Sequence, residues 1–246
     1  SLVNSRWIQL YLAMIIDSVI NSMTRKYAVY TSCGDFSFCD QMWNSDTRDY
    51  DLLASFYGND TSRFVELSSI FDFVIREKGS KFQNFYKLYT LSNKLWNYER
   101  IFILDDDIII SPSEINAMFE FAEEYNLWIC QPSFSSRSKI SHEVTRQVPN
   151  SHFRYTNFIE VNAPLMNRQA ISKLIAYYDP SLIEWGVDFL YTWANSLLSI
   201  PATGCKKFAI NDSITCTNPT TKNKGYKELS QLPGFELRIQ VWMAHA

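Results

Sequence analysis

Apolar residues along the chain form two kinds of segment, short unbroken runs and longer stretches with helical spacing. The short runs, rich in β-branched and aromatic residues, predict strands at 26–32, 50–57, 71–76, 101–104, 127–130 and 158–161. Helical spacing predicts helices at 81–98, 112–125, 168–178 and 185–196. This alternation is typical of a three-layer α/β fold, in which helices flank a mixed, mostly parallel sheet.

The first 25 residues differ from the rest, because apolar side chains occupy most sides of a helix predicted at 7–23. Gln9 and Asp17 interrupt its apolar run before it reaches the roughly 18 residues of a membrane span. We expect this helix to pack against the domain, to pair with a second copy in a homodimer, or to lie on a membrane surface. Residues 26–246 show no linker-like change in composition, and we expect them to form a single domain.

Composition and charge exclude several classes of protein. With 46% hydrophobic and 20% charged residues the chain is not disordered, and a net charge of −3 argues against a nucleic-acid partner. The five cysteines are odd in number and contain no C-x-x-C pair, which favours reduced thiols in a cytoplasmic protein.

Three consecutive acids at 105–107 are the sharpest chemical feature of the sequence. They follow the apolar run 101–104, and side chains alternate along a strand, so Asp105 and Asp107 should share one face. Asp106 should face the other way, in a structural role or beside a nucleotide. Capping of the next helix does not explain the acids, because Ser111 already provides that cap. Carboxylates at the end of a buried strand favour Mn²⁺ or Mg²⁺ and a phosphate ligand.

A polar stretch at 133–157 interrupts the pattern of strands and helices. A loop of this length in a compact domain is usually functional or disordered. Its basic and imidazole side chains are Arg137, Lys139, His142, Arg146, His152 and Arg154.

A strand, an acidic D-x-D triplet and a helix resemble the core of A-type glycosyltransferases, which have a Rossmann-like fold. Further blocks stand at 78–82, 131–133, 141–146, 158–164, 185–189 and 212–213. In this order the blocks resemble the glycosyltransferase-like family catalogued as domain of unknown function 707, over residues 27–220. The resemblance implies that the acids hold a metal ion on the diphosphate of a nucleotide sugar.

The resemblance also implies a set of metal and nucleotide-sugar ligands. Asp105 and Asp107 would bind the metal, and Asn218 stands where similar sequences have a histidine. Lys78 and Lys81 would neutralise the diphosphate, unless they are only solvated turn residues. The remaining predicted nucleotide-sugar contacts are Thr31, Cys33, Tyr57, Asp105 and Asp106.

The block at 185–189 resembles the segment that carries the catalytic base of many inverting A-type enzymes. Asp188 is the predicted base, with Glu184 and Glu160 as alternatives, although an acid at the start of a helix also stabilises the helix dipole. Predicted acceptor contacts are Trp185, Glu160, His142 and Arg146.

The sequence therefore predicts a metal-dependent glycosyltransferase that moves a sugar from a nucleoside diphosphate to a hydroxyl acceptor, with inversion, in surface glycan synthesis. Two alternatives stay open. One is an enzyme of metal-dependent phosphoryl or nucleotidyl transfer. The other is a carbohydrate-binding or scaffold domain with a decayed transferase fold.

Overall fold

The computed structural model describes residues 14, 16, 18, 25–92, 95–195, 206–220 and 230–245. The predicted N-terminal helix, with its homodimer or membrane contact, lies outside the described residues apart from three separate positions. None of the helices in the described ranges is long and apolar enough to cross a membrane.

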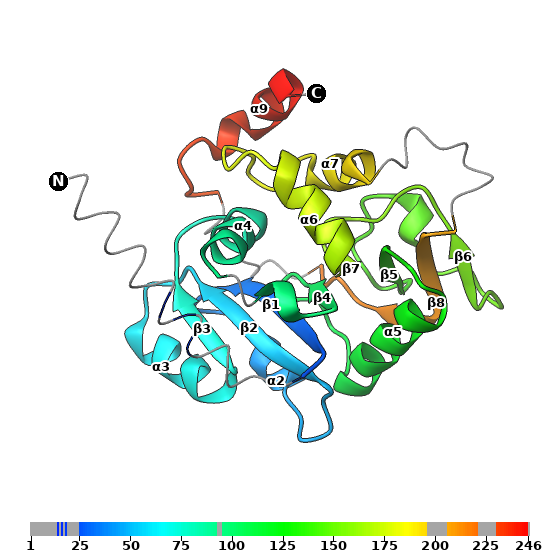
Figure 1. Ribbon diagram of the computed structural model, residues 1–246, viewed down its shortest axis with the longest axis horizontal. Helices are drawn as coiled ribbons and strands as arrows, with labels where there is room; N and C mark the ends of the chain where they lie inside the picture. The colour runs from blue at the N-terminus through cyan, green and yellow to red at the C-terminus, as the bar shows by residue number, and fades with distance from the viewer. Residues whose placement is uncertain are drawn as a thin grey trace.

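A mixed sheet of eight strands forms the centre of the described structure, in the order β3-β2-β1-β4-β7-β5-β8-β6 (Figure 1). Neighbouring strands pair in parallel within β3-β2-β1-β4 and between β5 and β8, whereas β7 and β6 pair antiparallel with their neighbours. The strands are β1 (Tyr27–Cys33), β2 (Tyr50–Phe56), β3 (Phe73–Arg76), β4 (Arg100–Ile103), β5 (Ile129–Phe134), β6 (Phe153–Tyr155), β7 (Leu165–Asn167) and β8 (Phe208–Cys216). The predicted α/β class with a mostly parallel sheet is confirmed.

Helices cover both faces of this sheet, because successive strand residues point to opposite sides. Tyr30 of β1 packs in a cluster with α4 and α6, whereas its neighbour Val29 packs in a second cluster with α2 and α5. Figure 1 shows α4, α6 and α7 on one side and α2, α3 and α5 on the other. The helices are α2 (Cys39–Trp43), α3 (Thr61–Ile70), α4 (Lys81–Leu91), α5 (Pro112–Glu124), α6 (Arg168–Tyr177), α7 (Val187–Ala194) and α9 (Arg238–His245). Short 3₁₀ turns are η1 (Leu95–Asn97), η2 (Glu143–Thr145) and η3 (Phe235–Leu237).

The predicted strand at 158–161 is wrong. Residues in this segment form no ladder, because the Glu160 amide donates to the Gln131 side chain at 2.6 Å and the Ile159 carbonyl accepts from the Tyr191 hydroxyl at 2.5 Å. The strand of this region is β7, a few residues later. The predicted helix at 81–98 ends as α4 at Leu91, and the polar stretch 133–157 contains β6 and η2.

Six strands end at one edge of the sheet, since β1 to β4, β5 and β8 all point the same way. At this edge the Leu104 amide donates to the Tyr30 carbonyl at 3.0 Å, and the Asp105 amide donates to the Asn162 carbonyl at 2.9 Å. The acids therefore begin where the central strand leaves the sheet. Ligands of open α/β sheets bind beyond this edge.

Candidate active site

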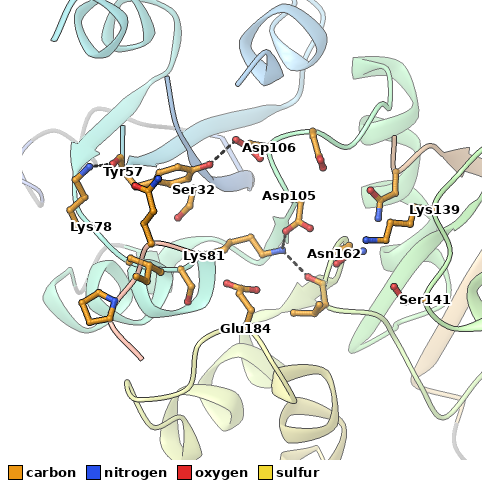
Figure 2. Close-up of a pocket in the computed structure, with 18 of the residues that line it drawn as sticks. Ser32, Tyr57, Lys78, Lys81, Asp105, Asp106, Lys139, Ser141, Asn162 and Glu184 are labelled. Atoms are coloured by element: carbon orange, nitrogen blue, oxygen red, sulfur yellow. Dashed lines mark hydrogen bonds and ion pairs between the residues drawn. The ribbon is translucent and has the colours of Figure 1, made fainter. Parts of the chain in front are cut away.

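A pocket of about 580 Å³ lies at the carboxyl edge of the sheet. It gathers eight predicted site residues from distant parts of the sequence (Figure 2). These residues are Tyr57, Lys78, Lys81, Asp105, Asp106, Asp107, Glu184 and Asn218. The pocket has both carboxylates and ammonium groups in its wall, so it suits a polar ligand.

Asp105 is paired with a buried lysine. Lys81 Nζ lies 2.5 Å from Asp105 Oδ1 and donates to the Val161 carbonyl at 2.8 Å. The Lys81 side chain is 5% exposed and that of Asp105 34%, so the ion pair spans the boundary between core and pocket. Lys81 is the first residue of α4, which a capping box between Ser80 and Gln83 starts at this point. The helix start thus fixes the position of the cation.

Asp106 points away from this ion pair, toward the loops after β1 and β2. Its Oδ2 accepts hydrogen bonds from the Ser37 hydroxyl and, at 3.4 Å, from the Tyr57 hydroxyl. Desolvation raises the pKa of Asp106 to about 7, and the negative charge of Asp107 acts in the same direction. These bonds join the acidic turn to two neighbouring loops, as a structural role predicts.

Asp107 and Asn218 supply two further oxygen-bearing side chains to the same pocket. Together with Asp105 they form a donor set of carboxylate and amide oxygens, which fits a hard cation that takes its other ligands from water and phosphate. Within the described ranges, no group of three or more His, Cys, Asp or Glu side chains is gathered closely enough to hold a metal by itself.

Lys78 is held by the loop after β2. Its ammonium donates to the Tyr57 carbonyl, to the Gly58 carbonyl at 3.3 Å and to Asn59 Oδ1 at 2.8 Å. Gly79 follows with a φ of +149°, and a Cβ there would lie 2.5 Å from Asn84 Oδ1. This turn therefore requires glycine, and it directs Lys78 to one side of the pocket.

Glu184 is the carboxylate on the pocket wall opposite the acidic strand. It has a φ of +59°, and its Oε1 accepts from the Phe82 amide at 3.0 Å, near the start of α4. Burial raises the pKa of Glu184, while the positive charge of Lys81 opposes this shift. A backbone in the left-handed region is unusual for a glutamate, and such residues often lie at functional sites. Glu184 is therefore a candidate functional residue.

Glu160, Asp188 and His142 form a second cluster outside the pocket lining. The Glu160 carboxylate accepts from Thr145 Oγ1 at 3.0 Å and from Asn162 Nδ2 at 3.1 Å. Desolvation raises the pKa of Glu160 to about 7, and the charge of Asp188 adds to the effect. Asp188 Oδ1 accepts from the Phe189 amide at 3.0 Å, as an acid at a helix start does. Asn162 and Ser141, which both hydrogen-bond to Glu160, line the pocket, whereas Glu160, Asp188 and His142 lie outside its lining.

Four other predicted site residues lie outside the pocket lining. Thr31 and Cys33 are fully buried, and the Thr31 hydroxyl donates to the Leu104 carbonyl at 2.8 Å. Trp185 is 47% exposed, and Arg146 forms a two-pronged ion pair with Glu143 at 2.8 and 2.9 Å. The structure does not bring these side chains together with the acids, and their roles stay predictions.

Several pocket residues were not singled out by the sequence. Lys139 and Ser141 come from the polar stretch, whose length and composition were the available signal. Asn162 directly follows the segment 158–161, which was wrongly predicted to be a strand. Gln231, Leu232 and Pro233 come from the C-terminal segment, which carries no motif that would place it here.

The fold is similar to that of S. aureus TarS. The structure of TarS 1-349 in complex with UDP-GlcNAc matches with a TM-score of 0.55 and 11% sequence identity, over 89% of this chain and 66% of that chain. A longer TarS structure matches with a TM-score of 0.53 and 12% identity, over 83% of this chain and 38% of that chain. This chain thus spans well under half of the longer TarS structure.

No protein-family model matches the sequence, and no curated protein matches it. The resemblance to domain of unknown function 707 therefore stays a prediction. At these identities the similarity to TarS shows the fold alone, and it agrees with the α/β fold with a mostly parallel sheet that the sequence predicts.

Proposed function

We propose that the protein is a metal-dependent glycosyltransferase that moves a sugar from a nucleoside diphosphate sugar to a hydroxyl acceptor. One observation carries the proposal. The acids 105–107, Lys81 and Glu184 line one pocket at the carboxyl edge of a sheet with the A-type glycosyltransferase fold. The roles proposed in surface glycan synthesis and in the cytoplasm rest on the sequence alone.

The TarS complexes support a uridine-linked donor, because TarS 1-349 was crystallised with UDP-GlcNAc. The pocket volume of about 580 Å³ also lies in the range of small-molecule sites, roughly 300–1,000 Å³. We therefore place the nucleoside diphosphate in this pocket, with its phosphates near the acids.

Asp105, Asp107 and Asn218 would hold a divalent Mn²⁺ or Mg²⁺ ion on the diphosphate. Such an ion stabilises the negative charge that develops on the departing diphosphate. Lys81 already neutralises part of the charge of Asp105 and Glu184, so the repulsion between these carboxylates is reduced before a donor binds.

Glu184 is the general base that the geometry supports best. Its carboxylate lines the pocket, the Phe82 amide fixes one of its oxygens, and its raised pKa brings it closer to the working pH. Glu184 would take the proton of the acceptor hydroxyl while the hydroxyl oxygen bonds to the anomeric carbon. The bond from that carbon to the diphosphate oxygen breaks in the same step, and the sugar inverts. Asp188, outside the pocket lining, is the alternative base.

A thermal-shift panel tests this proposal. UDP, GDP, CDP and UDP-GlcNAc are each added with Mn²⁺ and with EDTA. A ligand at a hundred times its dissociation constant should raise the free energy of unfolding by about 2.7 kcal/mol. We expect a shift with one nucleotide that depends on Mn²⁺ and disappears in Asp107→Ala. Failure of all four nucleotides to bind would contradict the proposal, and binding without sugar transfer would indicate a decayed transferase.

A further inference from the structure

Three lysines line the pocket, and two of them are already engaged. Lys78 donates to three oxygens of the loop after β2, and Lys81 is bound to Asp105 and the Val161 carbonyl. Lys139 is different, because its ammonium has no hydrogen bond or ion pair with any residue that the structure describes. It lies on the other side of Asp105 from Lys78 (Figure 2).

The backbone around Lys139 is nevertheless fixed to the sheet. The Lys139 amide donates to the Asn218 carbonyl at 2.8 Å, and the Asn218 amide donates to Ser138 Oγ at 3.1 Å. The Ser138 amide in turn donates to the Ser135 carbonyl at 3.0 Å, and Ser135 Oγ lies 2.8 Å from Thr217 Oγ1. The loop therefore presents its lysine from a defined place beside the end of β8, next to one of the proposed cation ligands.

The charges of the pocket favour such a group if a diphosphate is to bind. Four carboxylates line the wall, from Asp105, Asp106, Asp107 and Glu184. An anionic ligand is repelled by them unless cations compensate. Lys78 and Lys81 would have to give up existing bonds to reach a phosphate, whereas the Lys139 ammonium has no such bond to a described residue to give up.

We infer that Lys139 is a binding residue for the donor diphosphate, on the side of the pocket opposite Lys78. The inference rests on the proposed function and adds a lysine ammonium of the protein to the proposed metal ion as a ligand of the diphosphate. A charged hydrogen bond from Lys139 to a phosphate oxygen would persist when the divalent ion is removed. Loss of this hydrogen bond should weaken the binding of ligands that carry a diphosphate and leave the binding of the nucleoside alone unchanged.

Calorimetric titrations of the full chain with UDP, uridine and pyrophosphate, in Mn²⁺ and again in EDTA, test the inference. We expect Lys139→Ala to weaken UDP and pyrophosphate binding by roughly tenfold to a hundredfold, the effect of one charged hydrogen bond. Affinity for uridine should not change. Lys139→Arg keeps the charge and should bind UDP within roughly threefold of the wild type.

The matched control is Lys207→Ala, a partly exposed lysine that bonds to the Asn126 carbonyl before β8 begins, at the other end of that strand. It should leave all three affinities unchanged. If the wild type binds UDP and Lys139→Ala binds it equally well, the inference is overturned and the proposed function stands. If the wild type binds neither UDP nor pyrophosphate, the inference is overturned, and the proposed function is overturned with it only if GDP and CDP also fail to bind. Equal weakening of UDP and uridine would show a general change in the pocket and would also overturn the role in phosphate binding.

Discussion

Lys81 Nζ lies 2.5 Å from Asp105 Oδ1, and this ion pair joins the first residue of α4 to the end of β4. The same ammonium donates to the Val161 carbonyl at 2.8 Å. Glu184 accepts from the next amide of α4, that of Phe82, at 3.0 Å. The start of one helix thus organises two carboxylates and a loop carbonyl around a single buried cation.

Removal of this cation should destabilise the pocket. In Lys81→Met the carboxylates of Asp105 and Glu184 face each other without a counter-charge, and the Val161 carbonyl loses its donor. We expect the free energy of unfolding to fall by roughly 1–3 kcal/mol, because the pair is partly solvated and a fully buried pair would lose more. Urea unfolding at pH 7 measures the change.

Lys87→Met on the same helix is the matched control, since Lys87 forms an exposed ion pair with Glu77. An exposed pair contributes less than about 1 kcal/mol, so this variant should remain close to the wild type. Adding Asp105→Asn to Lys81→Met should restore part of the stability. Equal losses for both lysine variants would show that the Lys81 pair has no special role.

Gly186 should tolerate no side chain, because it turns the chain between Glu184 and α7 beneath Trp242. Its φ is +82°, and a Cβ would lie 2.2 Å from Trp242 Cδ2. Gly186→Ala should therefore lower the free energy of unfolding by roughly 2–4 kcal/mol, from left-handed backbone strain and overpacking together. Thermal and urea unfolding measure the loss.

Gly234 separates these two contributions. It has a similar φ of +83°, but a Cβ there would meet only Ile183 Cδ1, at 3.8 Å. Gly234→Ala should lose only the backbone part, roughly 1–2 kcal/mol. In Gly186→Ala with Trp242→Ala the steric part should disappear. Equal losses of stability in the two glycine variants would show that Trp242 of α9 does not contact Gly186 in solution.

Much of the parallel half of the fold could be predicted from the sequence. Strands β1, β2 and β4 are apolar runs buried on both faces, and such runs show directly in the sequence. The position of the acids after β4 also followed from this pattern. The capping signature at Ser111 placed the start of α5 correctly.

The remaining half depends on contacts that no local pattern contains. The segment 158–161 has strand-like residues, yet the Gln131 side chain takes its backbone bond. The polar residues Asn211, Asp212 and Ser213 interrupt β8 in its middle, so its hydrophobic pattern is weak. Pocket residues such as Asn162 and Lys139 are brought in by long-range pairing of the chain. Their chemistry is ordinary in sequence and becomes specific only through position.

Glu160 should make stability fall as the pH rises. Its pKa is raised from 4.5 to about 7 by desolvation and it is 2% exposed, so the folded state keeps a proton that the unfolded state releases. The folded protein binds more protons between these pH values, and its stability from this group is lost as the pH rises toward 7. Glu160→Gln should therefore be more stable than the wild type at pH 8, by roughly 2–3 kcal/mol.

The difference between Glu160→Gln and the wild type should shrink toward zero below about pH 4.5, where both states of the wild type are protonated. Thr145 can accept from the new amide while its hydroxyl donates to the His142 carbonyl, 2.8 Å away. Urea unfolding at pH 4.5, 6 and 8 measures the trend. A constant difference across this range would mean that Glu160 titrates as an ordinary carboxyl.

Variants of Glu184 and Asp188 test which carboxylate controls the pH dependence of sugar transfer, because burial raises the pKa of both. A general base must be ionised, so the rate rises with pH until the base has lost its proton. Burial raises the pKa of Glu184, which moves this rise above the usual range of a carboxyl group. Glu184→Gln should lower kcat by roughly 10²- to 10⁴-fold and abolish the rise.

Nucleotide binding should survive in Glu184→Gln, because the amide oxygen can still accept from the Phe82 amide. Asp188→Asn should lower kcat less than roughly tenfold, because Asp188 lies outside the pocket lining and acts mainly at the start of α7. Release of nucleoside diphosphate from the donor that the binding panel identifies gives the rate of each variant from pH 5 to 9. Loss of the pH-dependent rise in Asp188→Asn but not in Glu184→Gln would assign the base to Asp188. The second acidic cluster would then have to open toward the pocket when the acceptor binds, because the donor site alone does not expose it.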